Sequence, residues 1–161
     1  MNTKTLTVNG ILAALYIAVS FLIAPIAFGS VQFRVPEMFN HLIVYNKKYF
    51  AGIVAGVFFS NLFFSPMKQL DLIFGVGQSA LALLIMIASV KFVKSILARM
   101  ILNTVVFTIT MFLIALELQL ALEMPFLFAW LTTAAGELVV MALGIPVILA
   151  LNKRLHFDKL V

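Results

Sequence analysis

The chain has 161 residues, which fits one domain over residues 1–161, and 64% of them are hydrophobic while only 11% are charged. This composition lies far outside the range of soluble domains, so it predicts an all-α integral membrane protein surrounded by lipid. The net charge of +5 does not indicate a nucleic-acid partner, because no basic stripe with interleaved aromatic residues lies on a soluble face.

Five apolar segments reach or approach the length of about 20 residues that a helix needs to cross a bilayer. They cover residues 5–28, 49–66, 71–90, 97–116 and 125–151. No small-residue cleavage pattern follows the first segment, so we expect a retained helix rather than a signal peptide. Between the first two lies the stretch 35–46, which is too short to span comfortably. Pro36 suits a first turn, Glu37 suits the positive end of a helix dipole and Asn46 suits an end, so we expect a short helix.

The basic residues do not decide whether this short helix crosses the membrane. Six crossings with a cytoplasmic N-terminus place only Arg34 and Lys68 outside, and five crossings with an external N-terminus make Arg34 and Lys4 exchange sides. The positive-inside rule therefore allows both arrangements, and both place the C-terminal tail in the cytoplasm.

Small residues recur at a spacing of four on two of the predicted helices, where they let helix backbones approach closely. The first ladder is Gly10, Ala14 and Ala18, and the second is Gly52, Gly56 and Ser60. Packing within the bundle explains both ladders, and the alternative is a docking face for another membrane protein.

The stretch 28–41 concentrates polar side chains beside segments in which a charged group is costly. Four residues at i, i+3, i+7 and i+11 share one face of an α-helix: Arg34, Glu37, His41 and Tyr45. This face predicts a ligand site. The alternative is a surface ion pair between Arg34 and Glu37 at the edge of a loop.

A second shared face follows in the segment 71–90, formed by Asp71, Gly75, Gln78 and Ala82. Asp71 would lie at the outer mouth of a site, with Gln78 about two helical turns deeper. The alternative, compatible with the first, is that Asp71 caps a helix that begins near Leu72.

The last segment aligns Trp130, Thr133, Glu137, Met141 and Gly144 on one face. Glu137 is the only acid well inside a predicted span, and an ionisable group there is a candidate for function. The alternative is a structural, protonated carboxyl bonded to a neighbouring helix. Trp130 is either an aromatic wall for a ligand or a residue of the interfacial belt.

Asparagines in otherwise apolar segments either join helices or reach a pocket. Asn61 is a candidate for the ligand site. Asn103 shares a face with Thr110 and Glu117, but the topology places it in the cytoplasmic half, so we leave it out of the site. Glu117 and Glu123 flank a short external loop, and we expect both to be solvated.

The sequence offers little support for catalysis. No serine has a histidine and an acid at a spacing that would suit a catalytic triad, and the sequence has no glycine-rich phosphate loop. Because the chain has no cysteine and only two histidines, we expect neither a metal site nor a cofactor.

Several short motifs follow one another along the chain: Gln32-Phe33-Arg34-x-x-Glu37 after Val31, Gly52-x-x-x-Gly56 leading to Asn61, Leu70-Asp71-x-x-Phe74-Gly75, Gly136-Glu137 and Gly144-x-Pro146. Together they resemble the QueT family of queuosine-precursor transporters over most of the chain. The resemblance implies the S-component of an energy-coupling factor (ECF) transporter in the cell membrane, with six transmembrane helices and both termini cytoplasmic. It also implies two ATPase subunits and a coupling transmembrane protein as partners. The coupling protein would face the first small-residue ladder.

The implied ligand is a 7-deazaguanine, as its aminomethyl form or as queuine. One edge of its ring presents N–H and amine donors, which a carboxylate can accept as a pair. The aminomethyl group adds a cation that requires a second acid, and the flat ring fits an aromatic wall. The predicted ligand residues are Arg34, Glu37, His41, Asn61, Asp71, Gln78, Trp130 and Glu137. Two alternatives are a small proton-coupled carrier that uses Glu137 as its relay and a membrane scaffold without a ligand.

Overall fold

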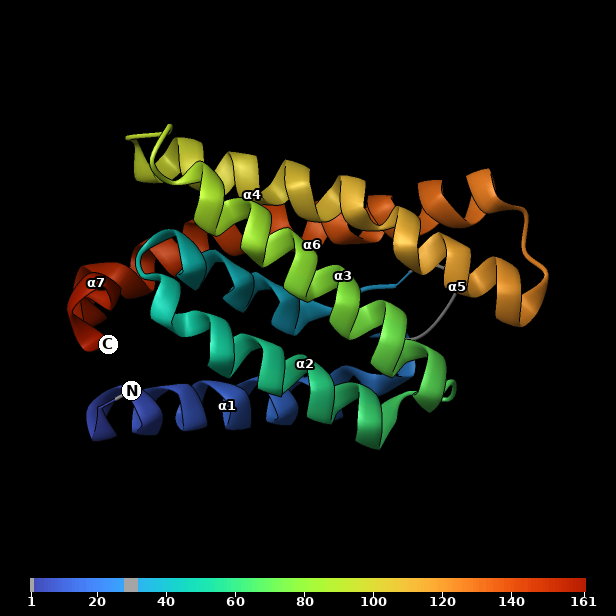
Figure 1. The fold of residues 1–161 in the computed structure, drawn as a ribbon, viewed down its shortest axis with the longest axis horizontal. Helices are drawn as coiled ribbons and strands as arrows, with labels where there is room; N and C mark the ends of the chain where they lie inside the picture. Colours follow the sequence, from blue (N-terminus) through green and yellow to red (C-terminus); the bar gives the residue numbers. More distant parts are fainter. Residues whose placement is uncertain (1, 28–31) are drawn as a thin grey trace.

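The structure is a computed structural model that describes residues 2–27 and 32–161, and every regular element within these ranges is helical. The beginning of the polar stretch, residues 28–31, lies outside the described residues. The elements are α1 (Thr3–Ala27), η1 (Val35–Val44), η2 (Lys47–Tyr49), α2 (Phe50–Phe64), α3 (Lys68–Ser89), α4 (Ile96–Thr110), α5 (Phe112–Leu122), α6 (Phe126–Leu155) and α7 (Phe157–Leu160) (Figure 1). The prediction of an all-α protein is therefore confirmed.

Four segments are long and apolar enough to cross a membrane: Thr3–Pro25, Lys68–Ser89, Ile96–Leu122 and Phe126–Leu155. Large apolar side chains lie exposed on their outer surfaces, among them Leu22, Ile73 and Leu131. The chain is therefore a multi-pass membrane protein. With 15 residues in α2 and 10 in η1, these two helices are shorter than a usual span, so the count of six crossings stays a prediction.

The two termini lie at the same end of the bundle (Figure 1). The Lys4 amine donates a hydrogen bond to the carbonyl oxygen of Lys159 at 2.9 Å. An odd number of crossings would place the termini on opposite faces of the membrane, so the five-crossing alternative is wrong.

The short helix η1 lies inside the bundle, where it contacts α1, α2, α3, α4 and α6. Pro36 occupies its first turn as predicted, but the element is a 3₁₀-helix rather than an α-helix. A 3₁₀-helix rises about 2.0 Å per residue, so these ten residues cover about 20 Å instead of about 15 Å. The element is short in sequence but reaches deep into the bundle.

Close packing of α1 against α2 depends on the second small-residue ladder. A Cβ atom at Gly52 would lie 2.5 Å from Oδ1 of Asn9, and one at Gly56 would lie 2.7 Å from Cβ of Tyr16. Gly52, Gly56 and Ser60 are all buried. The prediction that this ladder packs within the bundle is confirmed.

The first ladder behaves differently. Gly10, Ala14 and Ala18 are exposed, and nothing lies within 4 Å of a Cβ atom built at Gly10. Because α1 packs on its neighbours through its other face, the packing explanation is wrong for this ladder. Its use as a docking face stays a prediction.

Side chains at the end of the bundle that holds the termini form a set that we call the terminal clasp: Asn9, Asn46 and Tyr49. Asn9 donates to the carbonyl oxygen of Lys48 at 2.9 Å and accepts from the amide of Gly52 at 2.8 Å. Asn46 donates to the carbonyl oxygen of Val161 at 3.2 Å, and the Tyr49 hydroxyl donates to that of Phe157 at 2.8 Å. The clasp therefore ties α1, η2 and the C-terminal α7 together.

Candidate functional site

Five ionisable side chains are buried together in the interior, and we call them the Arg34 cluster: Arg34, Glu37, Asp71, Glu117 and Glu137. None is more than 5% exposed. They come from the residue before η1, from η1 itself and from α3, α5 and α6. Arg34 interacts electrostatically with all four acids. One guanidinium therefore faces four carboxyl groups in a region where unpaired charge is costly, so the cluster favours additional cations or hydrogen-bond donors.

Within the cluster, Arg34 forms an ion pair with Asp71. Nη2 of Arg34 lies 2.8 Å from Oδ1 of Asp71. The Ser65 hydroxyl donates to the other carboxylate oxygen, and Asn61 donates to the Asp71 carbonyl at 3.0 Å. Helix α3 begins at Lys68, so Asp71 lies in its first turn and does not cap it. The Asp71 cap is therefore wrong, and so is a surface ion pair of Arg34 and Glu37 at a loop edge, because both side chains are buried.

Glu37, the cluster residue on η1, has Asn40 of the same helix as a neighbour. The Asn40 amide donates a hydrogen bond to the Glu37 carboxylate. Residues i and i+3 eclipse in a 3₁₀-helix, so Arg34, Glu37 and Asn40 share the face that we had predicted for Arg34, Glu37, His41 and Tyr45. That prediction assumed α-helical periodicity and is wrong for Tyr45, whose ring packs at a tilt against that of Phe157 in α7, with centroids 5.7 Å apart.

His41 joins η1 to α4 and α6. Its Nε2 lies 2.9 Å from the carbonyl oxygen of Met141, and its Nδ1 lies 3.3 Å from the Asn103 amide nitrogen. Asn103 also donates to the carbonyl oxygen of Asn40 at 3.1 Å. Both ring nitrogens of His41 thus have partners within the protein. Asn103, which we left out of the predicted site, therefore lies against η1, because η1 reaches far enough along the bundle to meet it.

Tyr16 is the aromatic residue beside the acids. It is 3% exposed, and its hydroxyl hydrogen-bonds the Glu37 carboxylate. Trp130 instead donates from Nε1 to the Ile109 carbonyl at 3.2 Å and packs against Phe126, with ring centroids 5.9 Å apart. Sequence reasoning missed Tyr16, although it lies two turns after the buried Asn9 on the same face of α1.

A cavity of about 10 Å³ adjoins this tyrosine, which is room for about one water molecule. It is lined by Tyr16, Ser20, Ala27, Arg34, Pro36, Ser60 and Asn61. A space of this size cannot hold a group larger than a water molecule.

Glu117 and Glu137 are completely buried, and among the described residues neither carboxylate has a hydrogen-bond partner. The expectation that Glu117 is solvated is wrong. Its helix continues to Leu122 and packs against α3 and α6, so Glu117 faces the interior. The sequence pattern that indicated burial of Glu117 was its position on the same helix face as Asn103 and Thr110, both of which are buried as well.

The predicted face of α3 is confirmed, because Asp71, Gly75, Gln78 and Ala82 are all buried. Gln78 donates to the Thr110 hydroxyl at 2.9 Å and accepts from the Ser79 hydroxyl at 3.1 Å. Its amide therefore joins α3 to α4. The ligand roles predicted for Gln78, His41, Asn61 and Trp130 stay predictions.

Two glycines of α6 allow this helix to approach the polar stretch closely. A Cβ atom at Gly136 would clash with the carbonyl oxygen of Gln32, and one at Gly144 would lie 2.7 Å from Cβ of Met38. Glu137, next to Gly136, is thereby brought up to η1.

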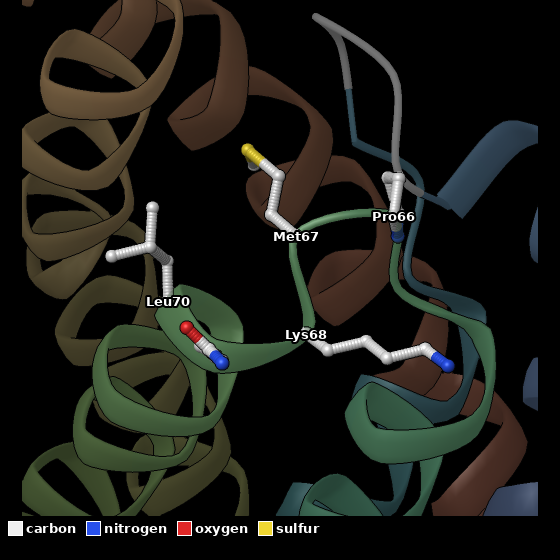
Figure 2. Close-up of a pocket in the computed structure, with 5 residues that line it drawn as sticks. Pro66, Met67, Lys68 and Leu70 are labelled. Carbon is white, nitrogen blue, oxygen red and sulfur yellow. The ribbon is translucent and has the colours of Figure 1, made fainter.

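Outside the cluster, a shallow surface hollow of about 390 Å³ lies at the loop between α2 and α3. It is lined by Pro66, Met67, Lys68, Gln69 and Leu70, and Figure 2 shows the Lys68 and Leu70 side chains pointing in different directions. None of the predicted ligand residues lines it. Within the described residues, no group of three or more His, Cys, Asp or Glu side chains could hold a metal ion.

Comparison with known proteins agrees with the motifs that meet in this interior. The sequence model of the family described as QueT transporter matches residues 6–153. The chain belongs to the QueT family. A relative described as queuosine precursor transporter QueT, from Lactococcus lactis subsp. cremoris (strain MG1363), is 33% identical over 168 aligned residues, which cover 98% of this chain and 98% of the relative. No solved structure matches the chain.

The resemblance to the QueT family is thereby confirmed, and the chain is a transporter rather than an enzyme. The structure also brings together two of the motifs that indicated the family. Arg34 of the first motif and Asp71 of the later one form the buried ion pair. In this QueT family member, the charged motif residues Arg34, Glu37 and Asp71 therefore lie in the interior and not on a surface loop.

Proposed function

We propose that this chain is the S-component of an ECF-type importer and that it binds a 7-deazaguanine precursor of queuosine. The name of the 33% identical relative supports the substrate class. The chemistry of the Arg34 cluster supports it independently, because the cluster offers acceptor oxygens in excess of donors.

The observation that carries the proposal is the buried carboxylate of Glu137. Among the described residues, both of its oxygens are without a partner. A 7-deazaguanine presents a ring N–H and an exocyclic amine side by side, and two parallel bonds to one carboxylate satisfy all four groups. We assign the ring edge to Glu137 and the aromatic wall to Tyr16, which lies beside the cluster.

The experiment is a ligand titration of the purified protein with the aminomethyl form and with queuine, read as thermal stabilisation. We expect stabilisation by one or both, because a ligand that binds only the folded protein raises the apparent melting temperature. No stabilisation by either ligand at concentrations far above nanomolar would contradict the proposed substrate class.

The partner proposal rests on the exposed ladder of Gly10, Ala14 and Ala18. We propose that it docks on the coupling transmembrane protein, which carries two ATPase subunits, in a cell membrane that places both termini in the cytoplasm. Lys4 and Lys48 lie at the end of the bundle that holds the termini, and the positive-inside rule favours this orientation.

Substitutions Ala14→Trp and Ala18→Trp test the docking face. We expect both to abolish co-purification with the ATPase-containing complex while ligand binding persists, because the large ring keeps the helices apart. The matched control is Leu131→Trp, at a position on α6 that is 70% exposed to lipid. Loss of association in the control as well would show that the effect is not specific to the ladder.

The buried, unpaired Glu137 also supports a second candidate, a proton-coupled carrier. This candidate predicts uptake that collapses with the proton gradient and needs no ATPase partner. Uptake that persists without the gradient but requires ATP excludes it.

A further inference from the structure

Glu117 has no role in the proposed function described so far, although it is as buried as Glu137. Neither of its oxygens has a partner among the described residues. The two glutamates have different neighbours, since Glu117 interacts electrostatically with Asp71 and Arg34 while Glu137 interacts with Glu37 and Arg34. The two glutamates therefore come from different helices, α5 and α6, and among the described residues each presents a buried carboxyl group without a partner.

The other two acids of the cluster already have donors. Asp71 accepts from Arg34 through one oxygen and from Ser65 through the other. Glu37 accepts from Asn40 and from Tyr16. By elimination, Glu117 is the acid that interacts with Asp71 and can accept bonds from an added group.

A 7-deazaguanine precursor with an aminomethyl arm has two ends. Its ring edge donates neutral N–H bonds, and the arm on the other ring carries an ammonium with three donors and a positive charge. A buried carboxylate gains most from a partner that supplies both charge and hydrogen bonds, because each group then replaces the water that the other has lost.

We propose that Glu117 binds the ammonium of the substrate side arm and is therefore a specificity residue for cationic precursors over uncharged ones. This inference rests on the proposed function, in which Glu137 holds the ring edge. The position of Glu117 fits the role, because α5 follows a break at Met111 and packs against α3, which carries Asp71.

The test compares two ligands that differ only in the arm: the aminomethyl form, which is cationic, and the 7-cyano form, in which an uncharged nitrile replaces it. Each is titrated against the wild-type protein, Glu117→Gln and Glu137→Gln. We expect Glu117→Gln to lose about 10- to 100-fold in affinity for the aminomethyl ligand relative to the nitrile, the effect of one charged hydrogen-bonding partner. Glu137→Gln should weaken both ligands together.

Equal effects of Glu117→Gln on the two ligands, or no effect on either, overturn the assignment. Glu117→Met, which is similar in volume and also uncharged, is the second variant and should show the same selective loss. Wild-type protein that binds neither ligand is a different result, because it overturns the proposed function itself.

Discussion

The terminal clasp and the Arg34 cluster are both built from polar side chains in or near the interior, but they differ in how completely their hydrogen-bonding groups are paired. In the clasp, Asn9 uses both amide hydrogens and its oxygen, and the Tyr49 hydroxyl has a carbonyl acceptor. In the cluster, the carboxylates of Glu117 and Glu137 have no partner among the described residues. Paired groups hold the helices in place, whereas acceptors left over in a dry interior are available to a ligand.

The largest effect should come from the buried ion pair of Arg34 and Asp71. Asp71→Ala removes the acceptor of both Arg34 Nη2 and the Ser65 hydroxyl, so we expect the free energy of unfolding to fall by about 3–5 kcal/mol. Thermal or denaturant unfolding in detergent measures it. The control Glu123→Gln removes an exposed carboxylate and should change stability by less than about 0.5 kcal/mol. Equal stability of the two variants would contradict a structural role for the pair.

Glu137→Gln should differ most from substitutions in the clasp, because it should change ligand affinity without lowering stability. We expect ligand affinity to fall by about 100-fold, since a charged acceptor pair is worth about 1.5–3 kcal/mol per bond before compensation. Stability without ligand should stay equal or rise, because the carboxyl group that is replaced has no hydrogen-bond partner to lose among the described residues. Calorimetric titration beside apo unfolding measures both quantities, and a drop in apo stability would place Glu137 with the paired groups instead.

In the clasp, Asn9→Ala should lower stability and leave ligand affinity unchanged, which is the opposite of Glu137→Gln. The substitution leaves the buried amide of Gly52 without its acceptor, so we expect a stability loss of about 1–3 kcal/mol. Ligand affinity should not change. Thr7→Ala is the matched control, because Thr7 is exposed on the same helix and bonds only the Thr3 carbonyl.

The smallest effect should be that of Tyr49→Phe, which removes one neutral hydrogen bond and should cost about 0.5–1.5 kcal/mol. Burial and the nearby Asp158 raise the pKa of Tyr49 to about 12. Because the pKa of Tyr49 is higher in the folded than in the unfolded protein, where it is near 10, Tyr49 contributes to stability below pH 10. This contribution is lost as the pH rises toward 12. The wild type should therefore lose stability between pH 10 and 12 more steeply than the variant, as alkaline unfolding would measure.

Sequence reasoning succeeded where periodicity matched the real helix. The face of Asp71, Gly75 and Gln78 on α3 was predicted correctly, and so was the inward glutamate of α6. It failed for η1, because three residues per turn place Asn40 beside Glu37 and move Tyr45 to the clasp end. Nothing local marks a 3₁₀-helix of this length, which depends on the neighbours that surround it.

Glu117 was misplaced for a related reason. A carboxylate near the end of an apolar segment usually reaches water, and only the length of α5 and its packing decide otherwise. The ion pair between Arg34 and Asp71 also required the tertiary structure, since 37 residues separate its members.

Helix α2 has a further consequence for the surrounding bilayer. Its 15 residues span about 22 Å, whereas the 30 residues of α6 span about 45 Å, and a hydrocarbon core measures about 30 Å. With six crossings, the lipid next to α2 would have to become thinner and α6 would have to tilt or project, each at a fraction of a kcal/mol per ångström of mismatch. The six-crossing topology therefore predicts that the orientation of the protein depends on membrane thickness, which makes the acyl-chain length of the host lipid an experimental variable.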